Sequence, residues 1–192
     1  LKGATIVPHP VFDVATVLAR IGEERISMLP GPPALYQSIL DHPDRASFDL
    51  SSLRLCVTGA APVPVELIER LRNELTFKTI VTAYGLTEST GVVSICRPDD
   101  DAETISNTSG CAIPDTEVRV VADKNDERPR GQPGEIVARG YDVLHGYFAT
   151  PEAPRAPVAG AGRPTTASTA PMTPRPSAKP CPRAASAYST RL

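Results

Sequence analysis

The first half of the sequence alternates short apolar runs with segments whose apolar residues recur every three or four positions. The run LRLCVTG at residues 53–59 is almost continuously apolar, as expected for a strand buried on both faces. The segment after Pro64 carries Leu67, Ile68 and Leu71 at helical spacing, and proline is favoured at the start of a helix. Strands that alternate with helices predict an α/β fold, a mostly parallel sheet with flanking helices.

The same alternation extends over the rest of this half. Asp13 precedes a second run of helical spacing and is placed to cap that helix. A third helix, opened by proline, is predicted up to about residue 40. Further strands are predicted at residues 4–8, 26–30 and 79–85.

From about residue 110 the pattern becomes that of antiparallel strands. EVRVV at 117–121 and GEIVAR at 134–139 flank a polar stretch that is rich in turn residues. The expected organisation is therefore an α/β subdomain at residues 1–106, followed by a small β-rich subdomain at 107–153.

The composition changes again after residue 153. Glu152 is the last acidic residue, and the remaining stretch holds five Arg, one Lys and eight Pro with few large apolar side chains. Such a stretch buries too little apolar surface to offset the cost of ordering it, so residues 154–192 are predicted to be a disordered, basic tail. Basic Pro-rich tails can also bind nucleic acid or SH3-like domains, which is the alternative interpretation of the tail.

Charge, hydropathy and cysteine usage all favour a cytoplasmic protein. The net charge is -2. Subtracting +6 for the tail leaves -8 for the rest, so no nucleic-acid partner is predicted for the body. No apolar run approaches the roughly 18 residues of a membrane helix, and the N-terminus lacks the features of a signal peptide. The four cysteines form no C-x-x-C pair, and we expect them to be reduced and non-catalytic.

Two polar loops follow predicted parallel strands, where ligands bind in sheets of this kind. The loop Tyr84-Gly85-Leu86-Thr87-Glu88 offers an aromatic face, a turn, a hydroxyl and a carboxylate within five residues. The aromatic face suits stacking on a base, the hydroxyl suits bonding to a phosphate oxygen, and the carboxylate suits holding Mg²⁺. The other loop, TGAAP at 58–62, is made of small residues that let a flat ligand approach the backbone. Taken singly, each loop is equally compatible with an ordinary tight turn.

The ordered set of motifs is more specific than either loop. TGAAP at 58–62, YGLTE at 84–88 and GEIVARGYDVLHGYFATPE at 134–152 follow one another along the chain. Together they resemble the adenylate-forming superfamily, which includes acyl-CoA synthetases, luciferases and peptide-synthetase adenylation domains. PGPPALY at 30–36 and the other motifs look most like stand-alone CoA ligases of fatty or steroid-derived acids. The resemblance covers residues 1–153.

The resemblance implies roles for the matching positions only. Gly59, Ala60 and Ala61 match the segment that lines the adenine site, and Tyr84 with Gly85 matches the aromatic turn that packs on adenine. Thr87 matches the residue near the α-phosphate, and Glu88 matches the carboxylate associated with Mg²⁺. Residues 30–36 match a wall of the acyl pocket. Glu135, Gly140 and Gly146 match positions that are mainly structural.

The resemblance also implies a two-step reaction. A carboxylic acid and ATP form acyl-AMP and pyrophosphate, and coenzyme A then displaces AMP to give a thioester. The family's phosphate-loop motif, its T-G-D motif and its C-terminal catalytic lysine are not found in this sequence. We therefore expect a fragment of such a ligase that is inactive alone. A peptide-synthetase adenylation fragment and a non-catalytic nucleotide-binding remnant are the alternatives.

The resemblance and the acidic residues stop at the same place. The stretch from residue 154 is rich in Ala, Pro, Arg, Thr and Ser, which GC-rich codons give when read out of frame. We therefore expect the tail to be the product of a frameshift.

Overall fold

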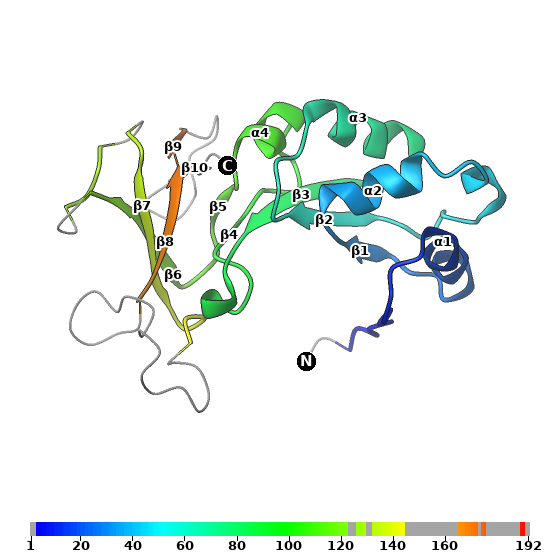
Figure 1. Cartoon of the computed structure of the whole chain (residues 1–192), viewed down its shortest axis with the longest axis horizontal. Coiled ribbons are helices and arrows are strands. Elements are labelled where there is room, and N and C mark those ends of the chain that lie inside the picture. The colour runs from blue at the N-terminus through cyan, green and yellow to red at the C-terminus, as the bar shows by residue number, and fades with distance from the viewer. Residues whose placement is uncertain are drawn as a thin grey trace.

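The described residues form a first, five-stranded sheet covered by helices, a second, three-stranded sheet, and a separate two-stranded pair (Figure 1). The structure is a computed structural model. It describes residues 3–122, 126–129 and 132–144, and the backbone of strands at 165–172, 174–175 and 189–190. In the part of the chain so described, no helix has the length and apolar character needed to cross a bilayer.

The first sheet confirms the predicted α/β class. Its five strands lie in the order β1-β2-β3-β4-β5, with β1, β2 and β3 mutually parallel and β4 and β5 antiparallel. The elements in chain order are α1 (Val14–Glu23), β1 (Met28–Pro30), α2 (Pro33–Leu40), the 3-10 turn η1 (Arg45–Ser47), β2 (Leu55–Gly59), α3 (Val65–Glu74), β3 (Thr79–Tyr84), the 3-10 turn η2 (Thr87–Ser89), β4 (Ser94–Ile95), α4 (Ala102–Asn107) and β5 (Cys111–Ala112).

The predicted helix starts are confirmed. The Asp13 carboxylate accepts a hydrogen bond from the Thr16 amide at 2.8 Å and so caps α1. Pro64 occupies the N-cap of α3, and α2 begins with Pro33. At these two starts proline costs nothing, because the first amides of a helix have no partner within it.

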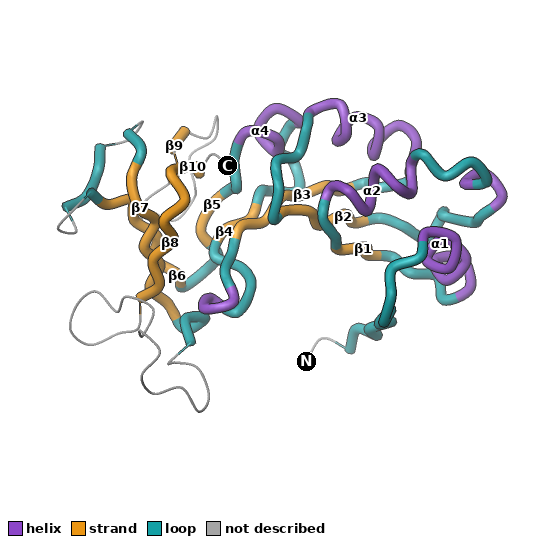
Figure 2. Tube along the Cα trace, in the orientation of Figure 1, coloured by secondary structure: helices purple, strands orange, loops and turns teal. Residues whose placement is uncertain are grey.

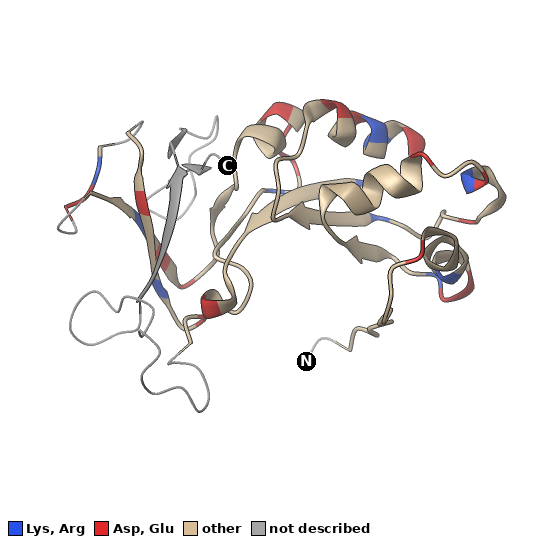
Figure 3. Cartoon of the chain, viewed as in Figure 1, with Lys and Arg blue, Asp and Glu red and all other residues tan. Residues whose placement is uncertain are grey.

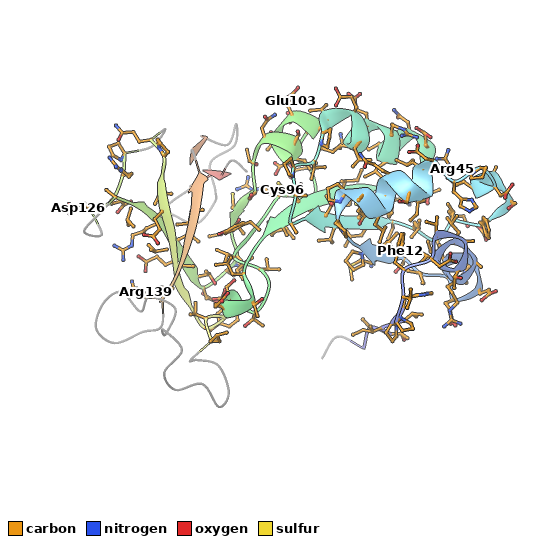
Figure 4. All side chains as sticks on the ribbon, in the orientation of Figure 1. Phe12, Arg45, Cys96, Glu103, Asp126 and Arg139 are labelled. Carbon is orange, nitrogen blue, oxygen red and sulfur yellow. The ribbon has the colours of Figure 1, made fainter. Side chains whose placement is uncertain are left out.

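The main core lies between the first sheet and its helices. Figure 2 shows α2, α3 and α4 along one face of that sheet. Ile68 and Leu71 of α3 are fully buried there, as the helical spacing predicted. The Thr82 hydroxyl of β3 donates to the Ile105 carbonyl of α4 at 3.0 Å. Cys96 lies between α4 and the sheet (Figure 4).

Charged residues are spread along α3 and α4 (Figure 3). Arg70 and Glu74 of α3 form an ion pair at 2.7 Å, which is extended to Arg45 at 2.9 Å and to Asp41 at 3.1 Å. These residues are partly exposed, so the network contributes modestly to stability. It ties the end of α2 to α3 on the outside of the core.

The predicted strand at residues 4–8 is wrong. The segment forms no regular structure, and Ile6 is 85% exposed. Pro8 and Pro10 lack the amide hydrogens that a strand needs for pairing. An apolar run becomes a strand only when a neighbouring strand pairs with it, and no described strand lies beside this one.

The second sheet confirms the predicted antiparallel pair. β6 (Thr116–Val121) pairs over its whole length with β7 (Gly134–Gly140), from Thr116 with Gly140 to Val121 with Glu135. The first sheet reaches Ala112, so the turn between the two sheets lies just before β6. The division of the chain at residues 106 and 107 remains a prediction.

Part of the tail differs from the expected absence of regular structure. The backbone of β8 (Thr165–Met172) pairs antiparallel with β7, and β9 (Pro174–Arg175) pairs with β10 (Ser189–Thr190). Backbone pairing on the open edge of β7 needs no large apolar side chains, and threonine favours strands. The prediction for the other residues of 154–192 falls outside those that the structure describes.

Burial of Cys56 predicts a loss of stability at alkaline pH. Desolvation raises the pKa of this fully buried thiol from 9.0 to about 12. Because the unfolded thiol ionises first, the associated stability is complete below pH 9 and falls as the pH rises towards 12. Between pH 8 and pH 10 the free energy of unfolding is expected to fall by about 1 kcal/mol more in the wild type than in Cys56→Ala. Urea titrations at each pH measure this difference, and equal pH dependence in both proteins would contradict it.

Candidate functional site

Two polar loops meet at one edge of the first sheet. β2 and β3 are parallel neighbours, and Gly59 at the end of β2 is paired with Ala83 near the end of β3. The loop that begins at Gly59 and the loop that begins at Tyr84 therefore leave the sheet side by side. This confirms the expectation that the two motifs are neighbours at the carboxyl ends of adjacent strands.

The first loop has an unusual backbone. Ala60 has a φ of 63° and its side chain is exposed. Left-handed backbone is uncommon for a residue other than glycine, and such strain concentrates at ligand sites. Ala61 is half-buried beside it. The loop thus presents small side chains at the sheet edge, as expected for Gly59, Ala60 and Ala61.

The second loop folds back on itself through local hydrogen bonds. The Ser89 hydroxyl accepts from the Leu86 amide at 3.0 Å, and the Gly91 amide donates to the Leu86 carbonyl at 2.9 Å. Gly85 is needed for this closure, because a Cβ atom at that position would lie 2.1 Å from the Gly91 carbonyl oxygen. The turn η2 thus holds Thr87 and Glu88 in a closed loop.

The three predicted side chains of this loop differ in exposure. Thr87 is exposed, while Glu88 and Tyr84 are half-buried. The Tyr84 ring packs against a small apolar cluster that includes Val93 and Val118. The ring is therefore fixed by the second sheet as well as by β3.

The segment predicted to wall an acyl pocket lies near the same edge. Residues 30–36 span the end of β1 and the start of α2, and β1 is the parallel neighbour of β2. Tyr36 is fully buried, and its hydroxyl donates to the Leu29 carbonyl at 2.6 Å, with the Val57 carbonyl at 3.1 Å. Tyr36 is thus a core residue, which leaves the more exposed residues of the segment to face a ligand.

The residues predicted to be mainly structural lie on or after β7. Glu135 and Gly140 are in β7 and are half-buried. Gly146 lies outside the described residues.

A magnesium ion at this edge would have to be held mostly by phosphate oxygens. Among the described residues, no group of three or more His, Cys, Asp or Glu is arranged to hold a metal. Mg²⁺ is usually bound through one or two carboxylates together with substrate phosphates and water. The single carboxylate of Glu88 beside the Thr87 hydroxyl is compatible with that mode of binding.

The structure brings residues 142–144, which lie within the third motif, into contact with this loop. The Leu144 amide donates to the Glu88 carbonyl at 2.9 Å, and the Thr90 hydroxyl donates to the Asp142 carbonyl at 2.6 Å. Residues 90 and 142 are 52 positions apart, and no periodicity or spacing in the sequence connects them.

The fold is an α/β domain with two polar loops beyond the carboxyl ends of neighbouring parallel strands, followed by an antiparallel unit. The AMP-binding enzyme family matches residues 1–148. The chain belongs to this family.

Two relatives share the same name. The 3-[(3aS,4S,7aS)-7a-methyl-1,5-dioxo-octahydro-1H-inden-4-yl]propanoyl:CoA ligase of Rhodococcus jostii is 53% identical over 152 residues, which are 79% of this chain and 27% of that protein. Its namesake from Mycobacterium tuberculosis is 48% identical over 156 residues, covering 81% of this chain and 29% of that protein. The chain therefore spans less than a third of the length of these relatives.

Solved structures agree with this membership. The N-terminal domain of FACL13 from Mycobacterium tuberculosis is 32% identical with a TM-score of 0.65, over 76% of this chain and 35% of that one. The O-succinylbenzoate coenzyme A synthetase of Bacillus subtilis, in complex with ATP and magnesium, is 26% identical with a TM-score of 0.63. That match covers 73% of this chain and 28% of the synthetase.

Proposed function

We propose that this chain is the adenine and magnesium side of the nucleotide site of an AMP-forming acyl-CoA ligase. The observation that carries the proposal is the pairing of Gly59 with Ala83, which sets the two motif loops next to each other. The names of the relatives support coenzyme A as the thiol that accepts the acyl group, rather than the carrier domain of a peptide synthetase.

Each loop has a separate part in the proposed site. The small residues Gly59, Ala60 and Ala61 let the flat adenine ring approach the backbone, and Tyr84 with Gly85 packs on that ring. Thr87 is exposed and donates its hydroxyl to an α-phosphate oxygen. Glu88 holds Mg²⁺, which when bound offsets the charge that builds up as two anions meet.

The acid substrate of the intact ligase is proposed to be an apolar carboxylic acid of the fatty or steroid-derived type. The support comes from the relatives, whose shared name describes a propanoyl group on a bicyclic ring system. Residues 30–36, at the end of β1, are placed to form one wall of the pocket for this acid.

The chain alone is expected to form no thioester. The family's phosphate-loop, T-G-D and C-terminal lysine motifs are not found in the sequence, so ATP is not positioned for attack by the acid. The test incubates the purified chain with ATP, Mg²⁺, coenzyme A and a series of fatty acids, and follows acyl-CoA by mass spectrometry. The Rhodococcus jostii ligase, assayed with its own acid, is the positive control. Thioester formed at a comparable rate by this chain would contradict the prediction.

A further inference from the structure

The loop that carries Thr87 and Glu88 is held at two points by residues 142–144, here called the clamp segment. The Leu144 amide donates to the Glu88 carbonyl at 2.9 Å. The Thr90 hydroxyl donates to the Asp142 carbonyl at 2.6 Å. The clamp segment therefore bonds to the backbone of Glu88, whose side chain is the proposed Mg²⁺ carboxylate, and to the side chain of Thr90 two residues further along.

One of these contacts holds a strained residue. Thr90 follows η2 with a φ of 56°, in the left-handed region that β-branched residues avoid. Strain of this kind persists only where surrounding contacts enforce it. The bond from the Thr90 hydroxyl to the Asp142 carbonyl is such a contact, so the shape of the loop depends on where the clamp segment lies.

The clamp segment is in turn anchored by the Asp142 side chain. This side chain is buried, and its Oδ1 atom accepts from the Thr116 hydroxyl at 2.9 Å. A Cβ atom at Gly140 would lie 2.4 Å from the same Oδ1 atom, so glycine there leaves room for the carboxylate. Thr116 and Gly140 are a register pair of β6 and β7. The anchor therefore belongs to the second sheet.

We propose that Asp142 is a positioning residue for the nucleotide loop. Through Oδ1 it fixes the clamp segment to Thr116. The clamp segment then holds Thr90 through the Asp142 carbonyl and the Glu88 carbonyl through the Leu144 amide. The role of Glu88 towards Mg²⁺ rests on the proposed function, whereas the mechanical link rests on the hydrogen bonds alone. The second sheet thereby sets the position of the backbone of Glu88, in the loop between β3 and β4 of the first sheet.

Amide hydrogen exchange, followed residue by residue by NMR on the full chain, tests the mechanical link. Asp142→Ala and Thr116→Val each remove one side of the anchor. They are expected to speed exchange at the amides of Thr90, Gly91 and Leu144 by about 3- to 10-fold, the effect of losing one hydrogen bond. Amides of β2 and β3 should keep their rates.

Two conservative variants are the matched controls. Asp142→Asn keeps an oxygen that accepts from Thr116, and Thr116→Ser keeps the hydroxyl that donates. Both are expected to exchange within about 2-fold of the wild type. The proposal is overturned if Asp142→Ala leaves the loop amides unchanged. It is equally overturned if β2 and β3 accelerate as much as the loop does.

Calorimetric titration with ATP, with and without Mg²⁺, tests the effect on Glu88. The gain in ATP affinity that Mg²⁺ confers is expected to fall by about 3- to 10-fold in Asp142→Ala and Thr116→Val and to be retained in both controls. The affinity for ATP without Mg²⁺ should change little. If Mg²⁺ raises the ATP affinity of Asp142→Ala and Thr116→Val as much as that of the wild type, the positioning role is overturned. If the wild-type chain binds no ATP, the proposed function is contradicted instead. The hydrogen-exchange rates alone then test whether the Asp142 anchor holds the loop.

Discussion

A chimera that carries residues 1–148 of this chain in the Rhodococcus jostii ligase is expected to form thioester, and Glu88→Gln is expected to slow it about 100-fold. The segment supplies the adenine and magnesium side of the proposed site, and the host supplies the remaining motifs. The substitution keeps the size of the side chain and removes the charge that is proposed to hold Mg²⁺. The rate of acyl-CoA formation at saturating ATP and varied Mg²⁺ measures the effect.

The control for this experiment is Glu69→Gln. Glu69 is exposed on α3 and takes no part in either loop, so the same chemical change there should leave the rate within about 2-fold. Circular dichroism establishes that each chimera is folded. A folded chimera without activity would contradict the proposal that residues 1–148 supply the adenine and magnesium side of the site. A Glu88→Gln variant with the activity of the unsubstituted chimera would contradict the proposed role of Glu88.

Ile68→Ala is expected to lower the free energy of unfolding by about 2–5 kcal/mol, whereas Ile6→Ala changes it by less than about 0.5 kcal/mol. Ile68 lies on the buried face of α3, and its truncation leaves a cavity in the main core. Ile6 is 85% exposed, so its truncation removes almost no buried surface. Urea denaturation measures both changes in the free energy of unfolding, and an unchanged m-value shows that each is a change in stability.

The two substitutions are chemically identical, so the comparison isolates burial. Similar losses for Ile6 and Ile68 would mean that residues 4–8 pack against the body, against the exposure that Ile6 shows. A loss below about 1 kcal/mol for Ile68 would contradict its place in the core.

The local elements of the first sheet could be predicted because each carries its own signal. The helical spacing in α3 and the continuous apolar run of β2 are short-range features, and Asp13 and Pro64 mark helix starts through contacts within one turn. The juxtaposition of the two motif loops also followed from these signals. Parallel neighbours with ligand loops at their carboxyl ends are a general property of α/β sheets.

Very short or unpaired segments could not be predicted in this way. β4 and β5 are each two residues long, which is too short for any alternation to appear. Residues 4–8 have the apolar character of a strand, yet Ile6 remains exposed. Whether an apolar run is a strand depends on a partner for its backbone, and the run itself contains no information about that partner.

The sequence by itself determined the class of fold, the family and the residues of the two motif loops, because these depend on local periodicity and on ordered motifs. Only the tertiary structure decided how the loop of Glu88 is held. The contacts of Thr90 and Glu88 with residues 142–144 join two sheets across more than 50 positions of sequence. Hydrogen bonds between distant segments depend on how the sheets pack, and a single bond of this kind leaves no periodic pattern in either segment.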